Sequence, residues 1–183
     1  MTYSLNFSKP LQGQFSMRRF LSLSLALSVV LFATLSHAKD ISGKAPDFTL
    51  KSNSGKNLQL SDFRGQIVLI NFWATWCGPC RQEMPKLNEI HKRYQRAGVT
   101  VLGVNVEDDS NLADDFLSKN PVDFPILYDT TSKVSELYKV DAMPYTVLVD
   151  ADGEMFYLHR GYKAGDEKAY TRRIKSGLRA LKH

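Results

Sequence analysis

The chain has 183 residues, enough for one domain, and its 43% hydrophobic and 23% charged residues are ordinary for a globular protein. Its net charge of +5 at neutral pH would suit a nucleic-acid ligand if the cations lay on the folded domain. Three of them, Lys9, Arg18 and Arg19, instead precede an uncharged apolar run, and without them the net charge falls from +5 to +2. The charge therefore does not predict a nucleic-acid partner.

The N-terminal region has the pattern of a secretory signal. Its basic residues are followed by sixteen uncharged residues, Phe20 to Leu35, and then by a small-x-small ending at Ala38. We expect a signal peptide over residues 1–38 and a domain over residues 39–183 that is exported, to the periplasm or elsewhere, and soluble after cleavage. A bilayer span usually needs about 20 apolar residues, so retention of the leader as a membrane anchor is the alternative.

The mature region alternates strand and helix patterns. Two short strands are expected between Ala45 and Gln66, around a Ser-Gly-Lys turn and followed by a helical turn at Ser61–Arg64. The unbroken apolar run Ile67–Ala74 predicts a central strand that is buried on both faces. Apolar residues then recur at the spacing of a helix, which predicts a helix over residues 79–97 that ends at Gly98.

The second half continues this alternation and closes with an antiparallel hairpin. The expected elements are a strand at 99–106, a helix at 110–119, a strand near 124–128, a helix at 132–138, a hairpin from 145 to 161 and a helix at 166–181. Glu107 and Asp108, directly after the second buried strand, are expected to lie in a solvated loop. Strands separated by helices predict an α/β fold with a central mixed β-sheet flanked by helices.

The tetrapeptide CGPC holds both cysteines of the chain, Cys77 and Cys80, between a buried strand and a helix. A thiolate at a helix N-terminus is stabilised by the partial positive charge and the free N–H groups there. We therefore expect a lowered pKa for the Cys77 thiol, which makes it the attacking nucleophile, and a more buried Cys80 that resolves the mixed disulfide. Gly78 permits the tight bend, and Pro79 fits the first helical turn, where its missing N–H has no partner to lose.

Two other roles are open to such a cysteine pair. A structural disulfide is disfavoured, because two intervening residues close a tiny loop and constrain the unfolded chain little. A structural zinc site usually needs four ligands, and the mature region adds only three histidines, His91, His159 and His183. His91 and His159 are expected to be packing or surface residues. No metal site is predicted, although a copper(I) site made of both thiols with a histidine or Met143 stays open.

Longer motifs around the cysteines, FWATWCGPCRQEMP and the downstream DAMPYTVLVDADG, resemble those of the thioredoxin superfamily. The N-terminal segment GKAPDFTLKSNSGKNLQLSDFRGQ and the leader resemble its TlpA/ResA/DsbE-like branch of periplasmic thiol-disulfide oxidoreductases. The resemblance covers nearly the whole mature region. It implies a thioredoxin-like fold with an N-terminal β-hairpin and a strand–helix insertion between Cys80 and Pro144.

The resemblance also implies roles for single residues. Cys77, Cys80 and Glu83 would be catalytic, with Glu83 tuning the cysteines and moving protons from its place one helical turn after Cys80. The alternative is a solvated Glu83 that is favoured only by the helix dipole. The buried aspartate that is usual in the strand before the motif is replaced here by Asn71. The expected substrate groove consists of Trp76, Gly78, Pro79, Met143 and Pro144, the last matching a cis-proline that faces the cysteines.

The Gly-Pro pair between the cysteines is that of thioredoxin, whose reduction potential of about −270 mV is far more reducing than the roughly −120 mV of DsbA. We therefore expect a protein-disulfide reductase with no cofactor other than its redox-active Cys77–Cys80 disulfide. The resemblance implies disulfide-containing substrates, such as apocytochrome c in cytochrome c biogenesis or copper-delivery proteins. It also implies a membrane thiol transporter of the DsbD or CcdA type as the electron donor.

Two functions of other classes stay open. A copper-binding metallochaperone would use the thiols as ligands instead of turning over disulfides. A peroxiredoxin-like peroxidase is suggested by the segments APDFTL and LSDFRGQ, which also resemble peroxiredoxins. The second cysteine two residues beyond the first, and Trp76 directly before them, fit the thioredoxin pattern better.

Overall fold

The structure is a computed structural model that describes residues 43–181. The predicted signal peptide, residues 1–38, and His183 lie outside the described residues. Within residues 43–181, each strand and helix expected from the sequence is present, with ends that mostly lie within two residues of the expected ones. The long helix expected over residues 79–97 is an α-helix that finishes as a short 3-10 turn.

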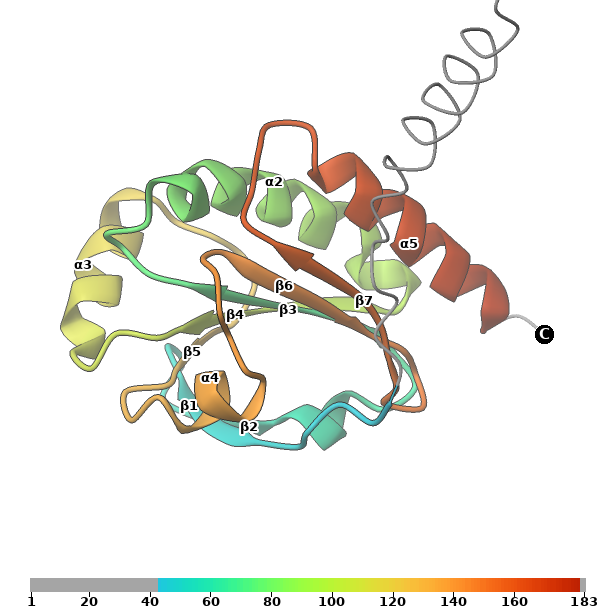
Figure 1. Ribbon diagram of the computed structural model, residues 1–183, viewed down its shortest axis with the longest axis horizontal. Coiled ribbons are helices and arrows are strands. Elements are labelled where there is room, and N and C mark those ends of the chain that lie inside the picture. Colours follow the sequence, from blue (N-terminus) through green and yellow to red (C-terminus); the bar gives the residue numbers. More distant parts are fainter. Residues whose placement is uncertain (1–42, 182–183) are drawn as a thin grey trace, which may run out of the picture. The chain divides into compact units, whose positions relative to one another are not determined.

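Seven strands form one mixed sheet in the described part of the chain (Figure 1). In spatial order they are β2 (Asn57–Gln59), β1 (Thr49–Ser52), β5 (Ile126–Tyr128), β4 (Val99–Asn105), β3 (Ile67–Trp73), β6 (Tyr145–Val149) and β7 (Met155–Arg160). The central strands β3, β4 and β5 are parallel, whereas the outer strands pair antiparallel. The mixed sheet and the N-terminal β1–β2 hairpin confirm the predicted α/β class.

The helices cover both faces of this sheet. They are α2 (Gly78–Tyr94), α3 (Ser110–Lys119), α4 (Lys133–Leu137) and α5 (Glu167–Ala180), with 3-10 turns η1 (Leu60–Phe63) and η2 (Gln95–Ala97). Figure 1 shows α2 and α5 on one side of the sheet and α4 on the other. Gly98 has a φ of 87°, a left-handed conformation that favours glycine, and it ends the helical segment as expected.

Strand β3 is buried along its whole length and separates two parts of the core. Leu69 and Trp73 belong to the part that includes both cysteines and residues of α2 and α5. Ile70 and Phe72 belong to the opposite part, with residues of α4 and the N-terminal segment. Because side chains alternate along a strand, Asn71 faces the same side as Leu69 and Trp73. A polar amide therefore points toward α2 and α5.

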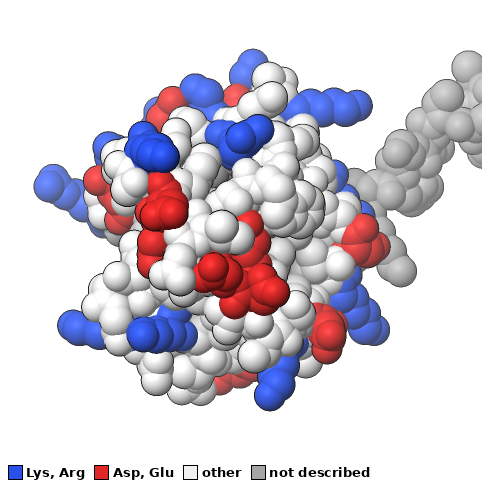
Figure 2. Space-filling view, turned by 90° about the vertical axis from the view of Figure 1, so that its left-hand side faces the viewer, with Lys and Arg blue, Asp and Glu red and all other residues white. Residues whose placement is uncertain are grey.

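The strand order brings the two parts of the expected site, the cysteines and the segment around Pro144, to the same end of the central strands. Strands β3 and β6 are antiparallel neighbours, with Phe72 opposite Tyr145. The end of β3, which leads to Cys77, therefore lies beside the start of β6, which follows Pro144. Helix α2 begins at this end of the strands, on the left in Figure 1. Figure 2 looks onto that side of the molecule, where acidic side chains gather.

Candidate active site

Cys77 and Cys80 form a disulfide at the start of α2. Cys77 is the N-cap residue, and its Sγ accepts a hydrogen bond from the backbone N–H of Cys80 at 3.2 Å. Cys80 is fully buried and Cys77 is nearly so, whereas Pro79 between them is exposed. The helix N-terminus thus directs a backbone N–H at the Cys77 sulfur. This geometry stabilises a thiolate once the disulfide is reduced.

The expected groove residues lie at the same end of the central strands as the disulfide. Trp76 exposes 68% of its surface, more than any other large hydrophobic residue between residues 43 and 181. The Met143–Pro144 peptide bond is cis, as expected from the resemblance. Met143 packs against the core cluster that contains both cysteines. A cavity of about 250 Å³ opens beside Met143, with walls from α4 and from Val106 after β4.

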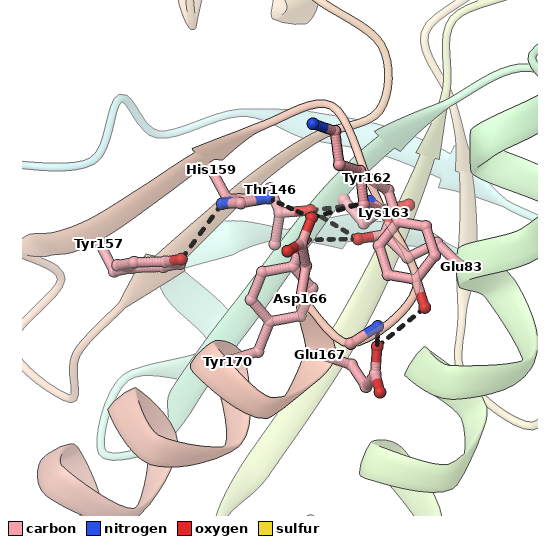
Figure 3. Close-up of polar contacts among 11 residues, drawn as sticks. Glu83, Thr146, Tyr157, His159, Tyr162, Lys163, Asp166, Glu167 and Tyr170 are labelled. Atoms are coloured by element: carbon pink, nitrogen blue, oxygen red, sulfur yellow. Dashed lines mark hydrogen bonds and ion pairs between the residues drawn. The ribbon is translucent and has the colours of Figure 1, made fainter. Parts of the chain in front are cut away.

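Glu83 is fully buried on α2, so the alternative of a solvated carboxylate is wrong. Its Oε2 accepts a hydrogen bond from Asn71 Nδ2 at 2.8 Å. Its Oε1 accepts one from the Tyr170 hydroxyl at 2.7 Å and a longer one from Thr146 Oγ1 at 3.5 Å, and Figure 3 shows these side chains meeting. Burial raises the pKa of Glu83 to about 7, with a smaller contribution from the charge of Asp166, although the hydrogen bonds oppose the rise. Glu83 can therefore gain or lose a proton near neutral pH.

The partners of Glu83 were not among the expected catalytic residues. Asn71 and Thr146 lie opposite each other on β3 and β6, and Asn71 Nδ2 donates to Thr146 Oγ1 at 2.9 Å as well as to Glu83. Asn71 Oδ1 has no hydrogen-bond partner in the described part of the chain. Tyr170 comes from α5, 87 positions after Glu83. Tyr170 lies on the buried face of α5 with Ile174, and no motif in the sequence links it to Glu83.

The expectation that Glu107 lies in a solvated loop is wrong. Glu107 is only 7% exposed, whereas Asp108 beside it is exposed. The Glu107 carboxylate accepts hydrogen bonds from the backbone N–H and the hydroxyl of Thr75, at 2.9 and 2.6 Å, and from Asn105 Nδ2 at 2.8 Å. The parallel register pairs Trp73 with Asn105, so residues two positions further on face each other. Glu107 thereby fixes the turn that leads into Cys77.

The two histidines in the described part of the chain differ in their surroundings. His91 is buried on α2 and packs against the Phe124 ring, with centroids 6.1 Å apart, which confirms a packing role. His159 is half-buried on β7, and its Nε2 lies 3.0 Å from Asp166 Oδ2. Among residues 43–181, no three His, Cys, Asp or Glu side chains come close enough together to hold a metal ion. The same residues contain no helix with the length and hydrophobicity to cross a membrane.

Sequence comparison relates the chain to known proteins. Residues 41–158, a range that contains both cysteines, Glu83 and Pro144, match the AhpC/TSA family. A relative from Oceanobacillus iheyensis, named thiol-disulfide oxidoreductase ResA, is 34% identical over 166 residues. That alignment covers 85% of this chain and 86% of the relative.

Solved structures show the same fold. A protein from Chlorobium tepidum described as the thiol:disulfide interchange protein DsbE superposes with a TM-score of 0.73 at 36% identity, over 76% of this chain and 98% of that one. The thioredoxin domain of a thiol-disulfide oxidoreductase from Bacteroides vulgatus gives a TM-score of 0.65 at 25% identity, over 74% and 96% of the two chains. The thioredoxin-like fold expected from the sequence is thereby confirmed.

Proposed function

This chain belongs to the AhpC/TSA family and is a thiol-disulfide oxidoreductase of the ResA and DsbE type, and we propose that it reduces protein disulfides with its Cys77–Cys80 pair. One observation carries this proposal. The pair opens a helix whose N-terminus directs an N–H at the Cys77 sulfur, and one turn later the same helix buries a carboxyl group, Glu83, that titrates near neutral pH. This arrangement suits a nucleophile, a resolving thiol and a proton acceptor.

The reaction balances in two exchange steps. In the reduced protein, the Cys77 thiolate attacks one sulfur of a substrate disulfide, forms a mixed disulfide and releases the other substrate sulfur as a thiolate. The Cys80 thiolate then attacks the Cys77 sulfur, which closes the Cys77–Cys80 disulfide and releases the second substrate sulfur. Two electrons pass from the protein to the substrate. The two protons that the protein thiols lose end on the two substrate thiols.

Glu83 serves the second step. Cys80 is fully buried, so its proton cannot pass directly to water. Glu83 lies three positions later on the same side of α2. With a pKa of about 7, a substantial fraction of its carboxyl groups is unprotonated at neutral pH and can accept the Cys80 proton. We assign Glu83 as the base of the resolving step.

The direction of electron flow follows from the Gly78-Pro79 pair. The same pair in thioredoxin accompanies a potential of about −270 mV, and a gap of roughly 150 mV to DsbA corresponds to about 7 kcal/mol for two electrons. A potential near that of thioredoxin makes the reduced protein an electron donor. Each turnover then leaves a Cys77–Cys80 disulfide that must be reduced again.

The leader sequence supports export of the protein, to the periplasm or to another compartment outside the cytoplasm. Reduction in an oxidising compartment needs electrons from the cytoplasm, and we propose a membrane thiol transporter of the DsbD or CcdA type as the donor. The substrates are disulfide-containing proteins, with oxidised apocytochrome c and copper-delivery proteins as candidates. The exposed Trp76, directly before Cys77, and Met143, directly before the cis-proline, offer apolar surface to such a substrate.

The test traps the mixed disulfide. The reduced Cys80→Ser variant, incubated with a peptide that contains one disulfide, should accumulate a covalent adduct on Cys77, seen as added mass in the absence of reductant. Cys77→Ser should form no adduct, because Cys80 is buried, and the wild-type protein should release the reduced peptide. Absence of an adduct on Cys80→Ser, or equal adducts on both variants, would contradict the assigned roles.

The other classes of function predict different results with the same proteins. A peroxidase would consume hydrogen peroxide faster than it reduces disulfides. A metallochaperone would bind copper(I) tightly through Cys77, lose that binding in Cys77→Ser and show negligible disulfide reduction. Either result would contradict the reductase proposal and favour the corresponding alternative.

A further inference from the structure

His159 and Asp166 form a polar pair beside the side chains that bind Glu83 (Figure 3). His159 Nε2 lies 3.0 Å from Asp166 Oδ2, and His159 Nδ1 lies 3.3 Å from the Tyr157 hydroxyl. Asp166 Oδ2 also accepts a hydrogen bond from the backbone N–H of Lys163 at 2.8 Å, so the loop before α5 holds the carboxylate in place. The His159 and Asp166 side chains are 26% and 31% exposed, so both can exchange protons with water.

His159 is a neighbour of both hydroxyl groups that bind Glu83. It lies directly opposite Thr146 in the β6–β7 ladder, so the two side chains share one face of the sheet. Its ring meets the Tyr170 ring edge to face, with centroids 5.4 Å apart. Thr146 and Tyr170 thus lie between the buried carboxyl group and the His159–Asp166 pair.

The charge of Asp166 acts on Glu83. After the larger effect of burial, the like charge of Asp166 further raises the pKa of Glu83. For Asp166 itself, burial favours a raised pKa, but the Lys163 N–H and His159 outweigh it and hold the pKa below its ordinary value. Asp166 is therefore negative at neutral pH. A proton on His159 places a positive charge beside it and offsets its effect on Glu83.

Other charged groups face this pair from the loop and from α5. Lys163 acts on Asp166 from the loop, and Glu167 accepts hydrogen bonds there from the Tyr162 hydroxyl and the Gly165 N–H. From α5, Arg172 acts on Tyr157, and the guanidinium of Arg173 lies 5.3 Å above that ring. Lysine and arginine keep their charge throughout the neutral range, whereas a histidine can change its charge there.

We propose that His159 and Asp166 are positioning residues that control, from the protein surface, how firmly Glu83 holds its proton. Asp166 favours the protonated form of Glu83, and protonation of His159 weakens that preference. The inference rests on the proposed function, in which Glu83 accepts the Cys80 proton.

The experiment measures the pKa of Glu83 directly. Side-chain carboxyl groups of ¹³C-labelled glutamate are titrated by NMR with the Cys77–Cys80 disulfide closed, so that no thiol titrates, and the Glu83 signal is the one that Glu83→Gln lacks. Asp166→Asn keeps the side-chain size and an oxygen for the Lys163 N–H, and should lower the pKa of Glu83 by about half a unit. His159→Gln can no longer carry a positive charge that offsets Asp166, and should raise the pKa of Glu83.

A matched control variant, together with the opposite signs of the two expected changes in the Glu83 pKa, distinguishes an electrostatic effect from a packing effect. Asp123→Asn removes a carboxylate that is likewise ion-paired, 2.9 Å from Lys92, and should leave the pKa of Glu83 as in the wild type. A merely structural role would loosen the cluster, admit water to Glu83 and lower its pKa in both test variants. The proposal is overturned if Asp166→Asn fails to lower the pKa of Glu83, or if His159→Gln fails to raise it. Failure of the proposed function would appear elsewhere, as a missing adduct on Cys80→Ser.

Discussion

Glu83 carries a negative charge near the cysteines only after it loses its proton, and its pKa of about 7 places this change in the neutral range. An ionised carboxylate near a thiol disfavours the thiolate. Glu83→Gln removes this charge, so we expect the reduced variant to have a lower thiol pKa and to react with iodoacetamide about threefold faster at neutral pH. Alkylation rates measured across pH, with far-UV circular dichroism to verify the fold, test this expectation.

The matched control is Glu89→Gln, the same substitution on an exposed position of the same helix, where Glu89 pairs with Lys86 at 2.8 Å. It should leave the pH profile of alkylation unchanged. A Glu83→Gln profile that coincides with that of the wild type would show that Glu83 does not influence the pKa of the thiols.

The elements themselves could be predicted, because each one is encoded by adjacent residues. The apolar run of β3 marks a strand buried on both faces, and the left-handed Gly98 marks the end of the helical segment. The disulfide was placed correctly at the N-terminus of α2 because C-x-x-C with Pro79 follows a buried strand directly. These are local signals.

The environment of the site could not be predicted, because it depends on contacts between distant elements. Asn71, Thr146 and Tyr170 reach Glu83 from β3, β6 and α5, and no periodicity in the sequence pairs them. Glu107 was misassigned for the same reason. A carboxylate after a strand resembles a surface residue until the β3–β4 register sets it against Thr75.

At the scale of the whole molecule, the buried Glu83 links folding to pH. Burial raises its pKa from 4.5 to about 7, so the folded protein keeps this proton over a range in which the unfolded chain has lost it. The stabilising contribution is fully present below about pH 4.5 and is lost as the pH rises through about 7. We expect the free energy of unfolding to fall between about pH 5 and 8 by on the order of 3 kcal/mol relative to Glu83→Gln, measured by urea denaturation. Parallel pH curves for the two proteins would show that Glu83 has the same pKa in both states.

The reduction potential of the Cys77–Cys80 pair tests the central claim most directly. The protein is equilibrated in thiol–disulfide buffers of defined potential, and its free thiols are then counted after alkylation. A dedicated reductant should show a potential near that of thioredoxin, about −270 mV, or below it. A value near the roughly −120 mV of DsbA would contradict the claim, because the protein would then donate disulfides to its substrates instead of reducing them.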